Sequence, residues 1–348
     1  MAGSSLPEVA TKLLNESLRV KKGETITVET WNTGLPLARE VVKQARRLGC
    51  IPVMVFEDEG IYSDGVKRSP KDVLGKMGKH EYGLLAATDV YVFIPGPPLG
   101  AYYKRITRQE YREATLYNDS WYQAAEKAKL RGVRLSFGYV GKDLAGYLGK
   151  SAGEVAKAQL RGMEADFKRI GAKGRKVSEK LRDGAWVTVI TGSGELRFRL
   201  KGAGAVEDGI VDKNDIASGE NVAYLPPGMA EKAVDRTSAT GSVRLSPSLT
   251  RLGIAESLGL DFAHGRLAGW SSRKPAPIID EVLKPIKEVD RVLNYITIGL
   301  NEKLGYGFGV DRFVAGSIGM SGWGFVGIVR NGTLKIDGST VVAGGKLR

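Results

Sequence analysis

The sequence has few of the residues that build metal centres and disulfide bonds. It contains two histidines, His80 and His264, and one cysteine, Cys50. A single cysteine excludes an intrachain disulfide. A catalytic zinc site usually takes several histidines or a mixture of histidine and carboxylate ligands, so two histidines argue against an ordinary metalloenzyme. Cys50 begins the apolar run CIPVMVF, which indicates the start of a buried strand, and we expect a small core residue rather than a reactive thiol.

Long apolar runs and nucleotide-binding motifs are also absent. No apolar run approaches the roughly 18 residues that a membrane helix needs, so we expect no membrane partner. The first residues contain no basic cluster followed by a long apolar stretch, which favours a cytoplasmic protein over a secreted one. Neither a glycine-rich dinucleotide motif nor a P-loop motif follows any predicted strand. We therefore expect no cofactor.

Positive charge is present in excess and is unevenly spread. The chain has 52 Lys and Arg against 39 Asp and Glu, a formal net charge of +13. Residues 1–180 hold 31 of the basic and 21 of the acidic residues, a net charge of +10. This excess indicates either an RNA or other polyanion partner or, more commonly, a solvated basic surface.

One segment of the basic half combines aromatic and basic residues. The segment YYKRITRQEYR, residues 102–112, interleaves tyrosines with basic side chains, a composition that suits stacking on bases and pairing with phosphates. The alternative is an ordinary helical surface. The polyanion-binding candidates are Lys104, Arg105, Arg108 and Arg112.

Apolar runs of strand length alternate with helical patterns in the first half of the chain. We predict helices over 8–20, 35–48, 80–87 and 108–130, and strands within 21–31, 50–59, 89–98 and 132–140. Such alternation is typical of an α/β domain with a mainly parallel sheet covered on both faces. Residues 151–182 are predicted to form a helix and a basic connector.

From Ala185 onward, short β-like runs separated by turn residues dominate, which predicts a β-rich α+β domain. We therefore divide the chain into two domains, residues 1–180 and residues 181–348.

Polar residues follow the first two predicted strands. Trp31, Asn32, the run from Glu57 to Glu59, and Tyr62 occupy these positions. Ligands of open α/β sheets bind at the carboxyl ends of strands, although a solvated loop is the simpler explanation of the acidic run.

Three stretches resemble the thermophilic metallo-aminopeptidases, the aminopeptidase T family, which are leucyl aminopeptidase-like. They are RVKKGETITVETWNTGLPLAREVVKQARRLGCIPV, then KVSEKLRDGAWVTVITGSGELRFRLKG, and then the C-terminal region from SGENVAYLPPGMAEKAV to GTLKIDGSTVV. They occur in the family's order and span nearly the whole chain. The resemblance implies the family's two-domain fold, in which residues 181–348 correspond to the catalytic domain, and it implies a homodimer.

The resemblance also implies a pair of metal ions, but this sequence departs from the family at the metal-binding positions. Where the family has Glu or His, or a nearby His-x-Asp pair, this chain has Met229, Tyr295, Arg312, Gly319, Gly324 and Val326. Glu231 lies two positions beyond Met229. Methionine, glycine and valine offer no suitable side-chain donor to a hard catalytic ion, and Arg312 would place a fixed positive charge in the site. We therefore expect a divergent homologue without bound metal, a pseudoenzyme.

The inherited cleft remains a candidate binding site. Its candidate residues are Met229, Glu231, Tyr295, Glu302, Tyr306, Asp311 and Arg312. We expect Arg312 to pair there with Asp311, Glu302 or Glu231, because a carboxylate left buried without a metal needs a cation. The alternative is a turn-rich structural segment over residues 300–312.

Three hypotheses about function follow. The first is binding of a peptide or small molecule without metal, and the second is binding of RNA or a ribonucleoprotein through the basic half. The third is an active aminopeptidase-like hydrolase whose metal site is rebuilt from Glu231, Glu302, Asp311 and their neighbours. Metal content distinguishes the third hypothesis from the other two.

Overall fold

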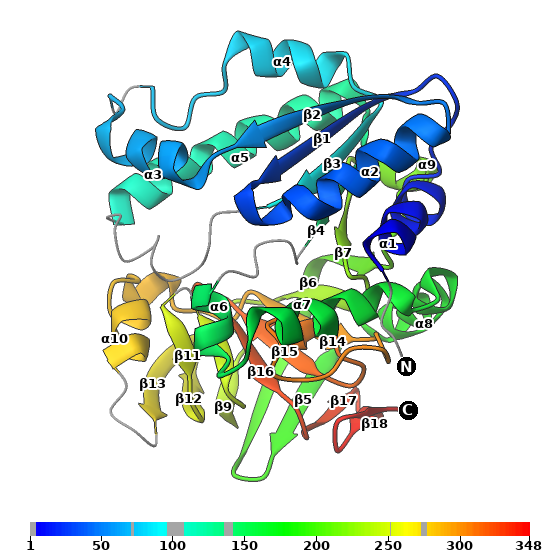
Figure 1. The fold of residues 1–348 in the computed structure, drawn as a ribbon. Helices are drawn as coiled ribbons and strands as arrows, with labels where there is room; N and C mark the ends of the chain where they lie inside the picture. The colour runs from blue at the N-terminus through cyan, green and yellow to red at the C-terminus, as the bar shows by residue number, and fades with distance from the viewer. Residues whose placement is uncertain (1–4, 71–72, 96–107, 136–141, 251, 273–276) are drawn as a thin grey trace. The chain divides into compact units, whose positions relative to one another are not determined.

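The computed structural model describes residues 5–70, 73–95, 108–135, 142–250, 252–272 and 277–348. The chain forms two compact units (Figure 1). Unit 1 contains residues 1–146, 150–164 and 209–226, and unit 2 contains residues 147–149, 165–208 and 227–348. The chain therefore leaves unit 1 three times and returns to it twice. A division into two independently folding domains near residue 180 stays a prediction.

Unit 1 is built on a five-stranded parallel sheet. Its strand order is β2–β1–β3–β4–β7. The bounds are Thr25–Trp31 for β1, Ile51–Glu57 for β2, Val90–Ile94 for β3, Arg131–Leu135 for β4 and Val222–Leu225 for β7. Strands β1 to β4 are the four that the sequence predicts. The fifth, β7, comes from a segment that the sequence analysis does not assign to this sheet.

Helices separate the strands of unit 1, as parallel pairing requires. They are α1 (Leu6–Lys12), α2 (Leu35–Arg47), α3 (Glu59–Arg68), α4 (Lys79–Ala86), α5 (Arg108–Ala128), α6 (Lys142–Tyr147), α7 (Ala152–Arg161) and α9 (Lys213–Ser218), with the end of α6 passing into unit 2. Helix α2 buries Leu37, Ala38 and Val41 at helical spacing, packs on α1, and is followed by Gly49 at φ +78°. Helices α3 and α4 contact α5.

Strand β2 lies at the edge of the sheet, so the expectation of a fully buried strand after Cys50 is wrong. Ile51 is 64% exposed and Phe56 is 49% exposed, whereas Cys50 itself is buried. An apolar run of seven residues is typical of a strand covered on both faces. Here β2 has a neighbouring strand, β1, along one of its edges only.

Unit 2 is β-rich and antiparallel. Its long sheet runs in the order β16–β15–β14–β8–β6–β5–β17–β18–β19, and β9, β12 and β13 branch from it through β6. The bounds are β5 Trp186–Thr191, β6 Gly194–Glu207, β8 Met229–Val234, β9 Thr240–Arg244, β12 Leu258–Ala263, β13 Arg266–Ser272, β14 Tyr295–Gly299, β15 Ile318–Ser321, β16 Val326–Val329, β17 Thr333–Ile336, β18 Ser339–Ala343 and β19 Lys346–Leu347. A separate pair joins β10 (Ser248–Thr250) to β11 (Gly253–Ala255).

Two helices accompany the strands of unit 2, α8 (Phe167–Lys180) and α10 (Pro277–Leu283). The expected basic connector is therefore part of a regular helix. Asp166 caps α8 by accepting a hydrogen bond from the backbone of Arg169. Gly174 allows the helix to lie close to β6, because a Cβ at this position would stand 2.2 Å from a methyl group of Val206.

The two units match the expected fold class, a mainly parallel α/β unit and a β-rich α+β unit. Among the described residues, no helix combines the length and the apolar character of a membrane span.

Candidate functional site

One face of the sheet in unit 2 brings together several candidate residues from different strands. Glu231 of β8 lies opposite Thr297 of β14, and Thr297 lies opposite Gly319 of β15. Because side chains alternate along a strand, Met229 and Tyr295 share this face. Val326 of β16 pairs with Ser321 and belongs to the same face. Four of the six positions at which the resemblance implies metal ligands, Met229, Tyr295, Gly319 and Val326, therefore share one surface, which we call the Glu231 face.

The opposite face of these strands is core. It carries Ala230, Ile296, Ile298, Ile318 and Met320, all of them buried. The alternation fixes the register, because a shift by one residue would move the whole apolar set to the other face. The core thus positions Glu231 and Thr297.

Glu231 is a half-buried carboxylate. Burial raises its pKa above the usual value, and the positive charge of Arg312 acts in the opposite direction. Within the described part of the chain, no hydrogen bond or ion pair satisfies the Glu231 side chain. The neighbouring Thr297 is 3% exposed, and its hydroxyl has no partner among the described residues. Two adjacent polar side chains on this face, the half-buried Glu231 and the buried Thr297, thus have no hydrogen-bond partner among the described residues.

Gly319 occupies the position at which the resemblance implies a histidine ligand. A Cβ at Gly319 would stand 2.2 Å from the hydroxyl oxygen of Thr297 and 3.1 Å from a methyl group of Val326. Thr297 therefore fills the space that a side chain at position 319 would need.

The Glu231 face does not fit a catalytic metal ion. Met229, Tyr295, Gly319 and Val326 supply no carboxylate or imidazole at the implied positions. Across the described ranges, no group of three or more His, Cys, Asp or Glu side chains is placed to hold an ion. A divalent ion needs several oxygen or nitrogen donors that converge at about 2.0–2.6 Å. Glu231 would supply only part of that set.

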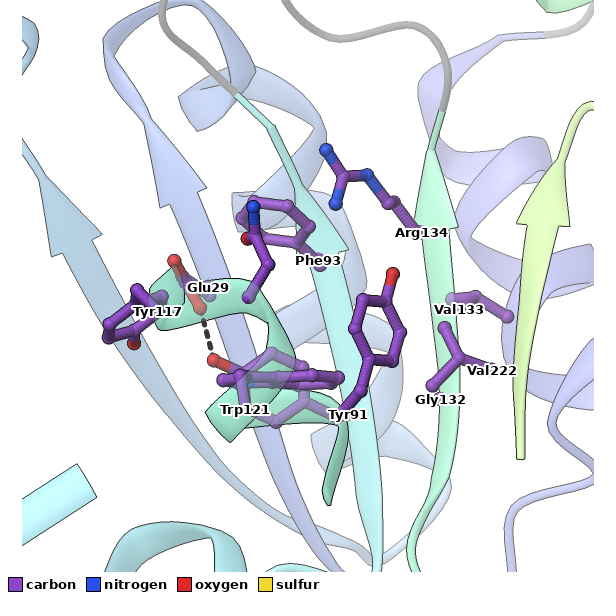
Figure 2. Close-up of a pocket in the computed structure, with 11 residues that line it drawn as sticks. Glu29, Tyr91, Phe93, Tyr117, Trp121, Gly132, Val133, Arg134 and Val222 are labelled. Atoms are coloured by element: carbon purple, nitrogen blue, oxygen red, sulfur yellow. Dashed lines mark hydrogen bonds between the residues drawn. The ribbon is translucent and has the colours of Figure 1, made fainter. Parts of the chain in front are cut away.

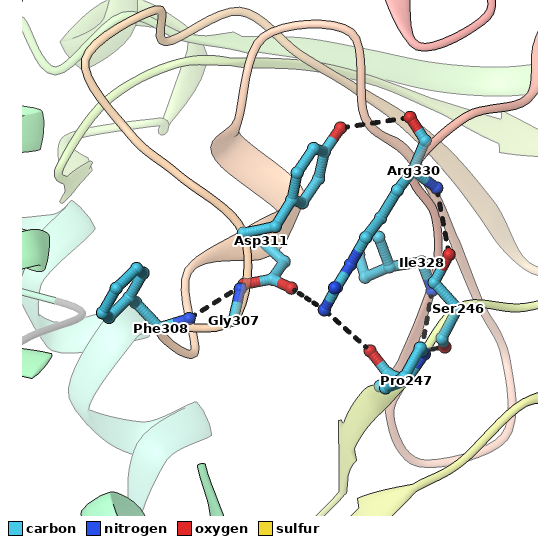
Figure 3. A network of polar contacts seen from close by, with 9 residues as sticks. Ser246, Pro247, Gly307, Phe308, Asp311, Ile328 and Arg330 are labelled. Atoms are coloured by element: carbon cyan, nitrogen blue, oxygen red, sulfur yellow. Dashed lines mark hydrogen bonds and ion pairs between the residues drawn. The ribbon is translucent and has the colours of Figure 1, made fainter. Parts of the chain in front are cut away.

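The loop after β14 contains a network centred on Asp311 (Figure 3). Asp311 accepts hydrogen bonds from the backbone amides of Gly307 and Phe308, and its other oxygen pairs with Arg330 at 2.9 Å. The Arg330 guanidinium also lies over the ring of Tyr306, 5.2 Å from its centroid. Burial raises the pKa of Asp311, while Arg330 and the two amides lower it. These contacts hold the loop in one conformation.

The expected pairing of Arg312 with Asp311 or Glu302 is wrong. Asp311 pairs with Arg330, and Glu302 accepts a hydrogen bond from Lys173 of α8, which lowers the Glu302 pKa. Arg312 lies over the ring of Phe313, 4.6 Å from its centroid, and attracts Glu231 without forming a salt bridge in the described structure. Arg330 has the role expected of Arg312 because strand pairing, not sequence proximity, places it beside Asp311.

The candidate cleft residues therefore occupy different environments. Glu231 and the 42% exposed Tyr295 lie on the Glu231 face, and Arg312 exerts its charge there. Met229 packs with Tyr306 on an apolar cluster that contains Phe313. A role of these residues in ligand binding stays a prediction.

Two of the polyanion-binding candidates, Lys104 and Arg105, lie outside the described residues. Arg108 and Arg112 lie in α5, in a part of the helix whose side chains are outside the description.

The net charges of the two units differ from those of the two parts of the sequence divided at residue 180. Unit 1 has 26 Lys and Arg against 22 Asp and Glu, whereas unit 2 has 26 against 17. Much of the basic excess of residues 1–180 belongs to α8, in unit 2.

The polar residues after β1 and β2 form a local structural network. The Asn32 amide donates to Asp58 at 2.8 Å and its carbonyl oxygen accepts from the backbone of Glu59. Asp58 caps α3, and Trp31 packs edge-on against Tyr62 with ring centroids 4.9 Å apart. The residues expected at the carboxyl ends of these strands do lie together, and their recorded contacts fix the start of α3.

A pocket in unit 1 is the feature that the sequence analysis missed (Figure 2). It is formed between the strands and α5 and encloses an empty volume of about 400 Å³, including space open to solvent. Its lining residues are Glu29, Tyr91, Phe93, Tyr117, Asn118, Trp121, Tyr122, Gly132, Val133, Arg134 and Val222. The available signal was Glu29, the one charged residue of strand β1, whose sequence is TITVETW.

Glu29 is the central polar group of this pocket. Burial raises its pKa to about 7, although a hydrogen bond from the Tyr91 hydroxyl favours the ionised form. The carboxylates of Glu81 and Glu57 raise the Glu29 pKa further, and Arg134 lowers it.

Aromatic rings surround the acid. Trp121 packs edge-on against Tyr91 with centroids 4.9 Å apart, and it makes a second edge contact with Tyr122. Arg134 lies over the ring of Phe93, 5.0 Å from its centroid. Charged and aromatic groups therefore share one enclosed space.

The fold is that of a solved bacterial structure. The chain matches wild-type AmpT from Thermus thermophilus with a TM-score of 0.67, and the match covers 98% of each chain at 14% sequence identity. The aminopeptidase T-like fold expected from the sequence is thus confirmed. No protein-family model and no curated protein matches this sequence.

Proposed function

We propose that this AmpT-fold protein binds a peptide or another small primary amine on the Glu231 face, without a metal ion and without metallopeptidase activity. The observation that carries the proposal is Glu231, a half-buried carboxylate with a raised pKa and no direct partner among the described residues. A ligand ammonium would supply the missing partner. The AmpT-like fold and the resemblance to aminopeptidases favour a peptide amino terminus as that ammonium.

The neighbours of Glu231 suit the rest of such a ligand. Arg312 provides positive charge near Glu231, which would attract a peptide carbonyl or carboxylate. A buried polar group without a partner typically costs about 1–3 kcal/mol, so a ligand ammonium that pairs with Glu231 would gain affinity from that contact.

Hydrolysis requires more than these residues supply. A peptidase must activate a nucleophile and stabilise the oxyanion that develops on the carbonyl. The Glu231 face offers one carboxylate, one hydroxyl and one nearby cation, and its implied ligand positions lack metal donors. We therefore propose binding alone.

Calorimetric titration of a dipeptide such as leucyl-glycine tests this proposal, with the N-acetylated dipeptide as the uncharged comparison. We expect the free amine to bind at least about tenfold more tightly than the acetylated form, and Glu231→Gln to remove the difference. Glu195→Gln is the matched control, because Glu195 is exposed on β6 and belongs to a hairpin away from this face. Equal binding of the two dipeptides, or an unchanged preference in Glu231→Gln, would refute the proposal.

RNA or ribonucleoprotein binding through residues 1–180 is the alternative, and the net charge of +10 supports it. Salt titration of RNA binding tests it, because phosphate contacts release counterions and make affinity steeply salt-dependent. Replacement of Lys104, Arg105, Arg108 and Arg112 by Ala would flatten the salt slope if these residues contact phosphates. If RNA fails to bind even at low salt, this alternative is excluded.

We further propose that the protein is a homodimer, as the family resemblance implies, and that it is cytoplasmic, as its sequence favours. Light scattering during gel filtration measures the mass directly. A mass of 37.5 kDa would be that of one chain and would refute the dimer.

A further inference from the structure

We infer that the pocket of unit 1 is a second ligand site, and that it takes a small organic cation of the methylated-ammonium class. This site is separate from the proposed site on the Glu231 face, since every residue that lines it belongs to unit 1. The inference rests on the aromatic walls, on the acid between them and on the balance of charge around them.

The aromatic walls suit a cation. Tyr91, Phe93, Tyr117, Trp121 and Tyr122 all line the pocket, so aromatic residues make up five of its eleven lining residues. The face of an aromatic ring attracts a positive charge, and enclosed rings are a common way to recognise quaternary ammonium groups. The structure contains an example of this attraction, because the Arg134 guanidinium lies over the ring of Phe93.

The acid in the pocket has few partners of its own. The hydroxyl of Tyr91, a residue only 4% exposed, donates to Glu29, and no ion pair joins Glu29 to a cation in the described part of the chain. A carboxylate can accept several hydrogen bonds, and burying one without a counter-charge is costly. A bound cation would provide the missing counter-charge.

The surrounding charges favour a cation over an anion. The titratable groups that interact with Glu29 are Glu57, Glu81, Tyr91 and Arg134, and those that interact with Tyr117 add no further cation. Three carboxylates therefore face one guanidinium, although the whole chain has a net charge of +13. A phosphate-bearing ligand would be repelled by these acids, and a neutral apolar ligand would leave Glu29 unpaired.

Two of the aromatic walls of the pocket are held by other side chains. Tyr117 is held by a hydrogen bond to Glu81 at 2.5 Å, and Tyr122 is held by Tyr224 at 2.9 Å. Two of the rings are thus fixed in place before a ligand arrives, which lowers the entropy cost of binding.

Calorimetric titration of choline into the full chain tests this inference, with the neutral tert-butyl analogue, in which carbon replaces nitrogen, as the comparison. The two probes have nearly the same shape and differ in charge. We expect choline to bind at least about tenfold more tightly, as cation–π attraction in an enclosed site allows. We also expect its affinity to rise between about pH 6 and pH 8, because the bound cation favours ionised Glu29. Proton release on binding, measured in buffers of different ionisation enthalpy, would accompany this rise.

Variants locate the site. Glu29→Gln should remove the preference for choline and its pH dependence, whereas Glu126→Gln, an exposed acid on α5, should leave both unchanged. Glu231→Gln should also leave choline binding unchanged, so failure of the proposed peptide site and failure of this one are distinguishable. Should Glu29→Gln fail to fold, the comparison of the two probes on the wild-type protein still decides the question. Equal affinity for the probes, or absence of saturable choline binding at both pH values, would overturn the inference.

Discussion

Arg330 donates a hydrogen bond to Asp311 across 2.9 Å and thereby ties the 3₁₀ turn Asp311–Phe313 to the end of β16. The two side chains are 28% and 12% exposed. Asp311 belongs to residues 300–312, the segment in which we expected Arg312 to pair with a carboxylate of a metal-free binding site. Its position makes Arg330 the residue on which the loop after β14 depends.

Replacement of Arg330 by Ala should therefore destabilise the protein strongly. Removing one partner of a buried pair costs about 3–5 kcal/mol, and we expect roughly 2–4 kcal/mol here because Arg330 is partly exposed. Arg312→Ala is the matched control and should cost under about 1 kcal/mol, since Arg312 forms no salt bridge in the described structure. Urea unfolding measures both values. A larger loss for Arg312 than for Arg330 would contradict the observed pairing.

The stability of unit 1 should depend on the ionisation of Glu29. Its pKa is about 7 in the folded protein against an ordinary value of 4.5, so folding favours the protonated form. The contribution of the group is fully present below about pH 4.5 and is lost as pH rises through about 7. Glu29→Gln keeps the neutral form at every pH, and it should become more stable than the wild type by roughly 2–3 kcal/mol at pH 8 but not at pH 4.5.

Denaturant unfolding at the two pH values measures this difference. Glu126→Gln again serves as the control, because Glu126 is exposed on α5, the helix that lines the pocket around Glu29. A variant that is less stable than the wild type at pH 8 would show that the Glu29 carboxylate is well solvated or paired in the folded state.

Gly319 and Thr297 should be energetically coupled. An added methyl group at Gly319 would stand 2.2 Å from the Thr297 hydroxyl, so Gly319→Ala should cost about 1–3 kcal/mol. Thr297→Ala removes the clashing oxygen, and in the double variant much of that cost should disappear. A coupling energy of about 0.5–2 kcal/mol from a double-mutant cycle is the expected result. Strictly additive effects would mean that the sheet adjusts to a side chain at position 319.

Local patterns in the sequence predicted most of the fold. The alternation of helical and strand patterns identified β1 to β4, and the turn-rich second half identified the antiparallel sheet. Strand β7 was not assigned to the parallel sheet because its pairing with β4 joins residues about ninety positions apart. Apolar content alone also could not place β2 at an edge, since edge and central strands can carry the same side chains.

The candidate site was harder to predict. The sequence identified Glu231, Asp311 and Arg312, but not Arg330, which strand pairing brings to Asp311 from nineteen residues away. The pocket around Glu29 was missed for the same reason. Its rings come from strand β3 and helix α5, its acid comes from β1, and the pattern along each segment is that of an ordinary core.

The metal content of the purified protein tests the central claim most directly. The chain would be incubated with zinc, manganese, cobalt and iron in turn, freed of unbound ion by gel filtration, and submitted to elemental analysis and an aminopeptidase assay. The account predicts far less than one metal ion per chain and no chelator-sensitive cleavage of peptides, because the Glu231 face lacks a convergent set of donors. About one ion per chain, lost together with a peptidase activity on chelation, would contradict it and would establish an active site rebuilt around Glu231.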